Sequence, residues 1–157
     1  MPSSETNPSV LIIGYGNPLR GDDGVGRMVA QRLERILSSS THDIRYPQQL
    51  SPELAEPISR AQIVIFIDAT RHSEAGEISQ RQLIPKPLSE SLGHHVNPQG
   101  LLVLADELFG RHADAYAFTV GGEWWGYSEC LSPKVESAVP VVIDRLMNLI
   151  ARCPCTS

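Results

Sequence analysis

Short apolar runs alternate along the chain with segments in which apolar residues recur at helical spacing. Runs of four or five apolar residues, many of them β-branched, are typical of strands buried on both faces. A segment in which every second residue is apolar predicts a strand with one buried face. The predicted strands are Val10–Ile13, a short strand Ile44–Tyr46, Ile63–Ile67, an edge strand within Ala75–Leu83, and a strand carrying Tyr116, Phe118 and Val120 that ends at Gly121.

Helices are predicted in the segments between these strands. A polar residue followed by proline is typical of a helix start, since it combines an N-cap with the preset backbone angle of proline. This pattern occurs three times, while a further helix follows a glycine-rich loop. The predicted helices therefore begin at Val25 and continue to about Ile36, run from Ser51 to about Ser59, begin at Asn97, and begin at Ser132 with Pro140, a residue type that kinks helices, inside the last one.

This alternation predicts an α/β fold with a mainly parallel, twisted sheet and helices on both faces. At 157 residues the chain matches the ~100–200 residues of one domain, so we expect residues 1–157 to form a single domain with its core at about 10–150. Ligands of such sheets bind at the carboxyl ends of the strands. We therefore expect Asp68, the loop Gly14–Gly24 and the loop after Gly121 to share one edge.

Composition changes this picture mainly by what it excludes. Hydrophobic residues make up 41% and charged residues 20%, as in ordinary globular proteins. A net charge of −5 offers no broad basic face for nucleic acid or anionic lipid. The apolar runs are far shorter than the ~20 residues that cross a bilayer, and residues 1–9 lack the layout of a secretory signal. We expect a cytoplasmic monomer with free thiols and with no nucleic-acid or membrane partner.

The loop Gly14–Gly24 follows a strand but matches neither common phosphate-binding pattern. The third glycine of a dinucleotide fingerprint would fall on Leu19, and both lysines of the chain lie far from the loop. The loop instead carries Asp22 and Asp23, whose negative charge would repel phosphate and attract a cation. Each acid alone also fits a structural role, Asp22 as a helix cap and Asp23 as a solvated acid in the first turn. We expect no nucleotide cofactor.

Two further groups extend this candidate cation site. Asp68 follows the buried run Ile63–Ile67, which predicts a carboxylate at the ligand-binding edge, although capping of the next turn would explain it equally well. The adjacent histidines His94 and His95 lie in a loop before the predicted helix at Asn97. Imidazole and carboxylate together suit first-row divalent metals. The other three histidines are expected to be structural or exposed.

The run Ile12–Gly26 resembles the opening signature of the hydrogenase maturation endopeptidases, with the sequence IIGYGNPLRGDDGVG. The segment Ile65–Ala69 is similar to the second acidic motif of that family, and Leu92-Gly93-His94 is similar to its histidine loop. Val120–Glu123 and Leu131–Pro133 resemble its last loop and helix start. The similarity extends over roughly residues 10–150, as one domain. Members of the family trim the C-terminal extension from the large subunit of nickel-iron hydrogenases.

This resemblance implies a site and an activity. By motif position, Asp23, Asp68 and His94 would bind a divalent metal and form the catalytic site, with His95 as an alternative to His94. The metal would be nickel, carried by the substrate, which is a [NiFe] hydrogenase large-subunit precursor. The expected activity is that of an endopeptidase, aspartic-type by family assignment, that removes the C-terminal extension of the nickel-loaded precursor.

Two other functions are compatible with the same residues. A non-catalytic, nickel-dependent chaperone of the immature large subunit would use the same three ligands without cutting the chain. A nucleotide-binding regulator would use the glycine loop, but the missing third glycine and the two acids count against it. How a peptidase would activate water stays open between a metal and a carboxylate base. No Ser–His or Cys–His nucleophile is recognisable, so we expect no covalent intermediate.

Overall fold

The structure, a computed structural model, describes residues 9–87 and 96–153. It contains one five-stranded sheet with the strand order β2-β1-β3-β5-β4. Four strands are parallel, and the edge strand β4 pairs with β5 in the antiparallel direction. The strands are β1 Val10–Gly14, β2 His42–Arg45, β3 Ile63–Thr70, β4 Ile78–Leu83 and β5 Asp114–Gly121.

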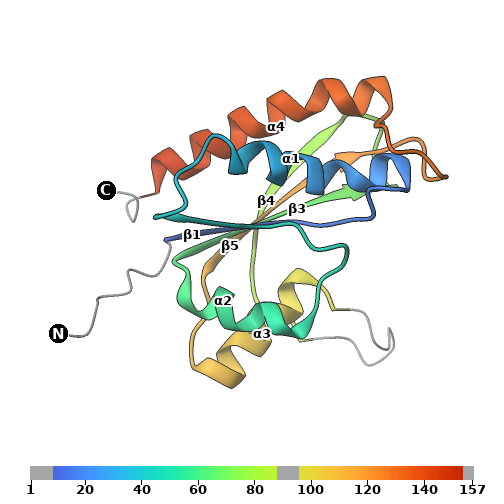
Figure 1. Cartoon of the computed structure of the whole chain (residues 1–157). Coiled ribbons are helices and arrows are strands. Elements are labelled where there is room, and N and C mark those ends of the chain that lie inside the picture. Colours follow the sequence, from blue (N-terminus) through green and yellow to red (C-terminus); the bar gives the residue numbers. More distant parts are fainter. Residues whose placement is uncertain (1–8, 88–95, 154–157) are drawn as a thin grey trace.

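Helices cover both faces of this sheet (Figure 1). Helices α1 Val25–Glu34 and α4 Pro133–Arg152 lie on one face, and α2 Ala55–Arg60 and α3 Pro98–Phe109 lie on the other. Two short 3₁₀ turns, η1 Gly21–Gly24 and η2 Pro52–Leu54, precede α1 and α2. The predicted α/β fold, mainly parallel with helices on both faces, is therefore confirmed.

The strands divide their side chains between two hydrophobic cores, because successive residues of a strand point to opposite faces. Ile12 and Ile65 pack with α1 and α4, whereas their neighbours Ile13 and Phe66 pack with α2 and α3. All four side chains are almost completely buried. This two-sided burial explains why the central strands are continuous apolar runs in the sequence.

Several element boundaries differ from the predictions. Strand β3 continues to Thr70, so Asp68 lies within the strand and not at its end. Helix α1 ends at Glu34, which leaves Ile36 outside it and 57% exposed. Helix α4 passes through Pro140 as one continuous element. Ser132 precedes α4, but its side chain does not cap the helix.

The glycine loop brings α1 very close to the sheet. A β-carbon at Gly14 would meet the backbone of Gly26, and a β-carbon at Gly26 would meet the carbonyl oxygen of Ile67 in β3. These two glycines therefore allow backbone-to-backbone packing that any other residue would prevent. Close packing of α1 on the sheet therefore explains the glycine pattern of this loop without a bound nucleotide.

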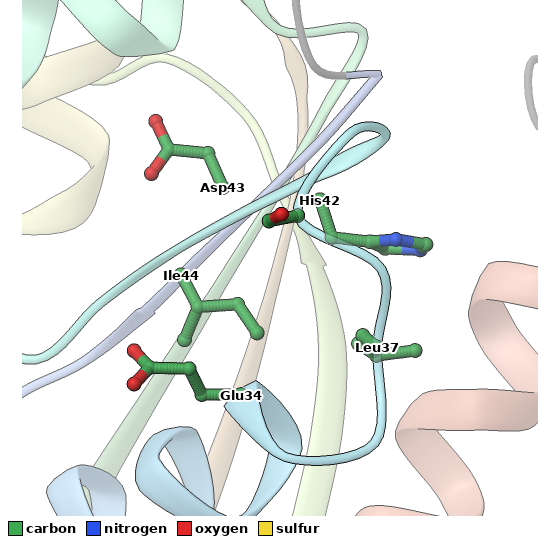
Figure 2. Close-up of a pocket in the computed structure, with 6 residues that line it drawn as sticks. Glu34, Leu37, His42, Asp43 and Ile44 are labelled. Atoms are coloured by element: carbon green, nitrogen blue, oxygen red, sulfur yellow. The ribbon is translucent and has the colours of Figure 1, made fainter.

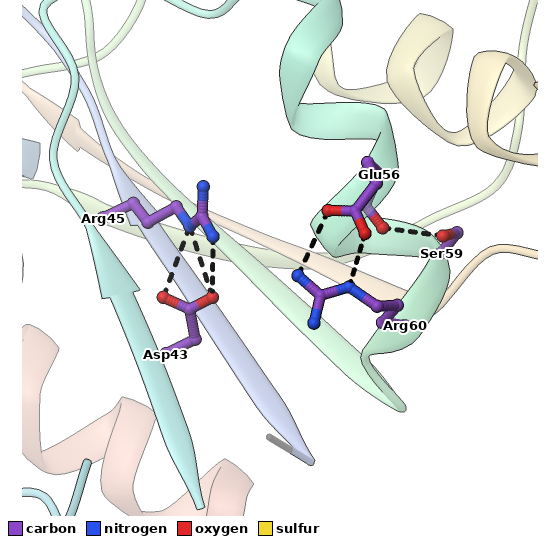
Figure 3. A network of polar contacts seen from close by, with 5 residues as sticks. All are labelled: Asp43, Arg45, Glu56, Ser59 and Arg60. Atoms are coloured by element: carbon purple, nitrogen blue, oxygen red, sulfur yellow. Dashed lines mark hydrogen bonds and ion pairs between the residues drawn. The ribbon is translucent and has the colours of Figure 1, made fainter. Parts of the chain in front are cut away.

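Polar contacts on the surface add little to this framework. Figure 3 shows an ion pair between Asp43 and Arg45 on β2, and another between Glu56 and Arg60 on α2. The charged side chains of both pairs are partly exposed, and exposed pairs contribute only about 0–1 kcal/mol.

Within residues 9–87 and 96–153, no helix combines the length and the apolar character that a membrane span requires.

Candidate functional site

The carboxyl ends of the parallel strands border a cavity of about 300 Å³, called here the carboxylate cavity. Asp23 and Asp68 both line it, although they come from η1 and β3. Its other walls come from the chain after β1, the chain after β2, and the chain just before α3: Tyr15, Gly16, Gln48, Gln49, Leu50 and Val96. The prediction that the glycine loop and Asp68 share one edge of the sheet is confirmed.

Asp23 is fixed by the loop that carries it. The backbone N–H of Asn17 donates a hydrogen bond of 2.8 Å to its Oδ2. Gly16 has a φ of +141°, and a β-carbon at this position would meet the carbonyl oxygen of Asp23. The loop therefore closes on Asp23 only because residue 16 is glycine. The side chain of Asp23 is half-buried and borders the cavity.

The environment of Asp68 is unfavourable for the negative charge of its carboxylate. Burial and, to a smaller extent, the negative charge of Asp23 raise the pKa of Asp68 to about 6. Hydrogen bonds from the Ala69 N–H, at 2.8 Å, and from the Tyr15 hydroxyl partly oppose this rise in the pKa. Two carboxylates that face one cavity and repel each other form a region that favours a cation.

Tyr15 is a site residue that the sequence analysis did not single out. Burial, together with the charge of Asp68, raises its pKa well above the ordinary value, so its hydroxyl stays protonated and donates to Asp68. Its backbone N–H bonds to the carbonyl oxygen of Ile67, which places Tyr15 beside Asp68 in the sheet. The pairing of the first and third predicted strands would have identified this neighbour.

Asp22 has a role that differs from the predicted helix cap. Its side chain is completely buried and points toward the loop after Gly121. Oδ2 accepts hydrogen bonds from the N–H groups of Glu123 and Trp124 and from the Ser132 hydroxyl, and Oδ1 accepts one from the Ser132 N–H. Burial alone would raise the pKa of Asp22, but these hydrogen bonds outweigh it and hold the pKa below its usual range. Asp22 therefore joins the two loops as a structural anion.

The loop that Asp22 holds presents aromatic side chains at the same edge. Trp124 is 54% exposed and packs beside Gly21, while the ring of Trp125 lies 4.3 Å from the guanidinium carbon of Arg71. Neither tryptophan belongs to the two hydrophobic cores. The loop is irregular, as its sequence predicts.

The third predicted ligand, His94, and its neighbour His95 lie outside the described residues. Within the described part of the chain, no group of three or more His, Cys, Asp or Glu side chains is placed to hold a metal ion. The structure thus brings together two of the three predicted ligands, Asp23 and Asp68, in one cavity. Carboxylate oxygens in such a pair suit a divalent cation, so these two residues fit one.

A second hollow of about 300 Å³, the β2 cavity, is lined by residues of β2, of the end of α1 and of the segment between them (Figure 2). Glu34, His42 and Asp43 all border it. In Figure 2 the side chains of His42 and Asp43 point to different sides, as adjacent strand residues do. The β2 cavity lies at the amino ends of the strands and does not gather its acidic and imidazole groups around one point.

Comparison with known proteins relates this architecture to solved structures. The chain superposes on a hydrogenase 2 maturation peptidase from a Thaumarchaeota archaeon with a TM-score of 0.69 and 24% identity, covering 90% of this chain and 97% of the other. The [NiFe] hydrogenase maturation protease HycI from Thermococcus kodakarensis gives 0.73 and 22%, with 95% and 96% coverage. The hydrogenase maturating endopeptidase HybD from E. coli gives 0.69 and 20%, with 90% and 91% coverage.

No protein-family model and no curated protein matches the chain. At identities of 18–24% the superpositions establish the fold alone. They cover almost the whole length of this chain and of the structures that it resembles. The chain therefore has, over nearly its full length, the fold of the hydrogenase maturation peptidases.

Proposed function

We propose that this protein is a hydrogenase maturation endopeptidase that removes the C-terminal extension from a nickel-loaded [NiFe] hydrogenase large-subunit precursor. The observation that carries this proposal is the placement of Asp23 and Asp68 in one cavity at the carboxyl edge of the sheet. These are the two acids that the sequence resemblance assigns to the metal site. The fold shared with maturation peptidases supports the same assignment.

The chemistry of the carboxylate cavity favours a cation that arrives with the substrate. The raised pKa of Asp68 means that the folded protein stabilises its negative charge poorly. A bound divalent cation would offset the repulsion between Asp68 and Asp23, and His94 would be the third ligand. Three protein ligands leave coordination positions open, as a metal shared with a substrate requires. A precursor without nickel would meet two uncompensated acids, so cleavage would report on nickel insertion.

The described residues also indicate how the site is kept in order. The Tyr15 hydroxyl and the Ala69 N–H donate to Asp68, and the Asn17 N–H donates to Asp23. Both carboxylates therefore enter the reaction already oriented, which reduces the entropy lost on binding. Asp23, Asp68 and His94 are the proposed catalytic residues. A carboxylate with a pKa of about 6 is also suited to accept a proton near neutral pH.

The test is processing of a purified, nickel-loaded large-subunit precursor from the same organism, followed by mass spectrometry. Wild-type protein is expected to release the C-terminal extension. Alanine variants of Asp23, Asp68 and His94 are each expected to lower the rate by at least about 100-fold, since general acid–base and metal-ligand groups contribute factors of this size. The variant Asp144→Ala is a matched control because Asp144 is exposed on α4.

Two results would count against the proposal. Full processing by all three variants would remove these residues from the site. An unchanged precursor mass after incubation with wild-type protein, combined with nickel-dependent binding, would favour the non-catalytic chaperone. Omitting nickel from the precursor supplies a further control, because an empty precursor is expected to remain uncut.

A further inference from the structure

A further cavity, of about 290 Å³, shares Tyr15 and Asp68 with the carboxylate cavity. It extends over the sheet toward the edge strand β4 and is called here the Arg81 cavity. Two of its walls come from β3 and from the start of α3. Its lining includes Phe66, Asp68, Arg81, Leu83, Ala117 and Thr119.

The Arg81 cavity exists because β5 has small residues on this face of the sheet. In the strand register, Ala117 lies between Phe66 on β3 and Arg81 on β4, and Thr119 follows on the same face. Short side chains on the middle strand leave a trough between the larger side chains on either side. The trough leads from the edge strand to Asp68.

The wall formed by α3 is fixed in place by its own hydrogen bonds. Asn97 caps the helix by accepting from the Gly100 N–H at 2.7 Å. The side-chain amide of Gln99 donates to the carbonyl oxygen of Ile84 at 2.8 Å. The principal polar groups of this wall are thus already engaged in structural contacts. Arg81, by contrast, has no hydrogen bond or ion pair with any described residue and acts on Tyr15 only through its charge.

We infer that the Arg81 cavity receives the substrate peptide beside the bond to be cut, and that the Arg81 guanidinium holds a main-chain carbonyl oxygen of that peptide. This inference rests on the proposed function and adds to it a subsite and a substrate-contacting residue. The guanidinium has five N–H donors and no acceptor, so a ligand that pairs with it must offer an acceptor such as a carbonyl oxygen. A carboxylate partner is disfavoured by the neighbouring charge of Asp68, whereas a peptide carbonyl is neutral.

The remaining surfaces of the cavity agree with a peptide occupant. Phe66, Leu83 and Ala117 supply an apolar floor for a side chain, while Arg81 supplies a donor for the backbone. The cavity shares Tyr15 and Asp68 with the carboxylate cavity, so a peptide in it would lie against Asp68 and beside the cavity that Asp23 lines. Arg81 is exposed on an edge strand, so its removal leaves the hydrophobic core intact.

The test measures processing kinetics of Arg81→Ala and Arg81→Lys with the nickel-loaded large-subunit precursor from the same organism. Loss of a contact that is equal in the ground and transition states raises KM without changing kcat. Arg81→Ala is expected to raise KM by about tenfold with kcat within about twofold of wild type. Arg81→Lys keeps the charge but loses the fork of donors, so it is expected to recover part of the loss.

Two control variants separate the loss of the Arg81 contact from the effects of changing strand β4 or of removing a surface charge. Gln82→Ala changes the same strand, but Gln82 points to the opposite face of the sheet. Arg35→Ala removes an equal charge from an exposed position after α1. Both are expected to keep the wild-type KM. A direct binding measurement follows NMR shifts of Ala117 and Thr119 while a synthetic peptide that spans the cleavage site is added, and these shifts are expected to weaken in Arg81→Ala.

The outcomes distinguish the inference from the function on which it rests. If wild-type protein cuts the precursor but Arg81→Ala has the KM of the two controls, the inference is wrong and the proposed function stands. Peptide-induced shifts that leave Ala117 and Thr119 unchanged would also overturn it. If wild-type protein neither cuts nor binds the precursor, both are wrong.

Discussion

At the scale of single residues, the adjacent acids Asp22 and Asp23 have different environments. Asp22 is fully buried and accepts hydrogen bonds from Glu123, Trp124 and Ser132, whereas Asp23 is half-buried and borders the carboxylate cavity. The difference arises because successive residues of the η1 turn point in different directions. One acid is therefore used to hold a loop, and the other is left to meet a ligand.

Replacement of Asp22 by alanine is expected to lower the free energy of unfolding by about 3 kcal/mol or more, since it leaves several buried donors without an acceptor. Urea unfolding followed by circular dichroism measures this change. Asp144→Ala, at an exposed position of α4, is the control and is expected to change stability by less than about 0.5 kcal/mol. Equal stability of the two variants would contradict the structural role of Asp22.

Asp68 is expected to reduce stability at neutral pH in the metal-free protein. Its pKa is raised from 3.8 to about 6 on folding, so the stability associated with its protonated form is present below about pH 4 and is lost as the pH rises through about 6. Asp68→Asn removes the charge. The variant is expected to be more stable than wild type by about 1–2 kcal/mol at pH 7.5, less than the full pKa shift because Asp68 is partly exposed.

This difference is measured by urea unfolding in the presence of a chelator, at several pH values. The difference in the free energy of unfolding between Asp68→Asn and wild type should develop between about pH 4 and pH 6 and stay constant at higher pH. Asp144→Asn, which removes a carboxylate from an exposed position of α4, supplies the control. A variant that is less stable than wild type at pH 7.5 would show that the carboxylate of Asp68 is well stabilised after all.

At the scale of elements, the position of the site depends on how closely α1 approaches the sheet. Gly26 lies in the first turn of α1, and its α-carbon faces the carbonyl oxygens of Ile67 and Tyr15. This contact places the N-terminal turn of α1, and with it Asp23, next to the end of β3. Helix propensity alone would favour alanine at this position by about 1 kcal/mol.

The variant Gly26→Ala therefore tests whether the close packing of α1 on the sheet outweighs the higher helix propensity of alanine. We expect a loss of at least about 3 kcal/mol in the free energy of unfolding, because a β-carbon would overlap backbone atoms that have no room to move. Gly110→Ala is the matched control: residue 110 has a φ of +80° at the end of α3 and open space around it, so its cost is only about 1 kcal/mol. A stabilised Gly26→Ala variant would contradict the close approach of α1.

At the scale of the whole molecule, the two ends of the sheet have different characters. The carboxyl end gathers Asp23, Asp68 and Tyr15 around two neighbouring cavities that share Tyr15 and Asp68 as lining residues. The amino end carries the β2 cavity, whose charged groups do not converge (Figure 2). This asymmetry follows from parallel strand order, which collects the loops after the strands at one edge.

Nickel binding at the carboxyl end of the sheet is expected to stabilise the whole molecule against unfolding. Ni²⁺ at about 100 times its dissociation constant would raise the free energy of unfolding by about 2.7 kcal/mol, seen as a rise in Tm. Alanine variants of Asp23, Asp68 and His94 should lose this rise, each measured against its own metal-free Tm, whereas His95→Ala should keep it. Loss in His95→Ala with retention in His94→Ala would assign the third ligand to His95.

The sequence by itself determined the layers of the fold and the edge at which the site lies. Buried apolar runs and helical spacing are local patterns, and parallel order then brings Asp68 and the glycine loop to the same end of the sheet. The sequence also indicated Asp23 and Asp68 as site residues, through their positions in the two acidic motifs. Local patterns suffice here because each strand and helix reveals its own buried face.

Only the tertiary structure decided the contacts between distant segments. Asp22 and Ser132 are 110 positions apart, and no periodicity in the sequence links them. The Tyr15–Asp68 hydrogen bond and the Arg81 cavity likewise depend on which strands are neighbours and on small side chains in β5. Strand register and side-chain volume set these contacts, and both are properties of the packed molecule.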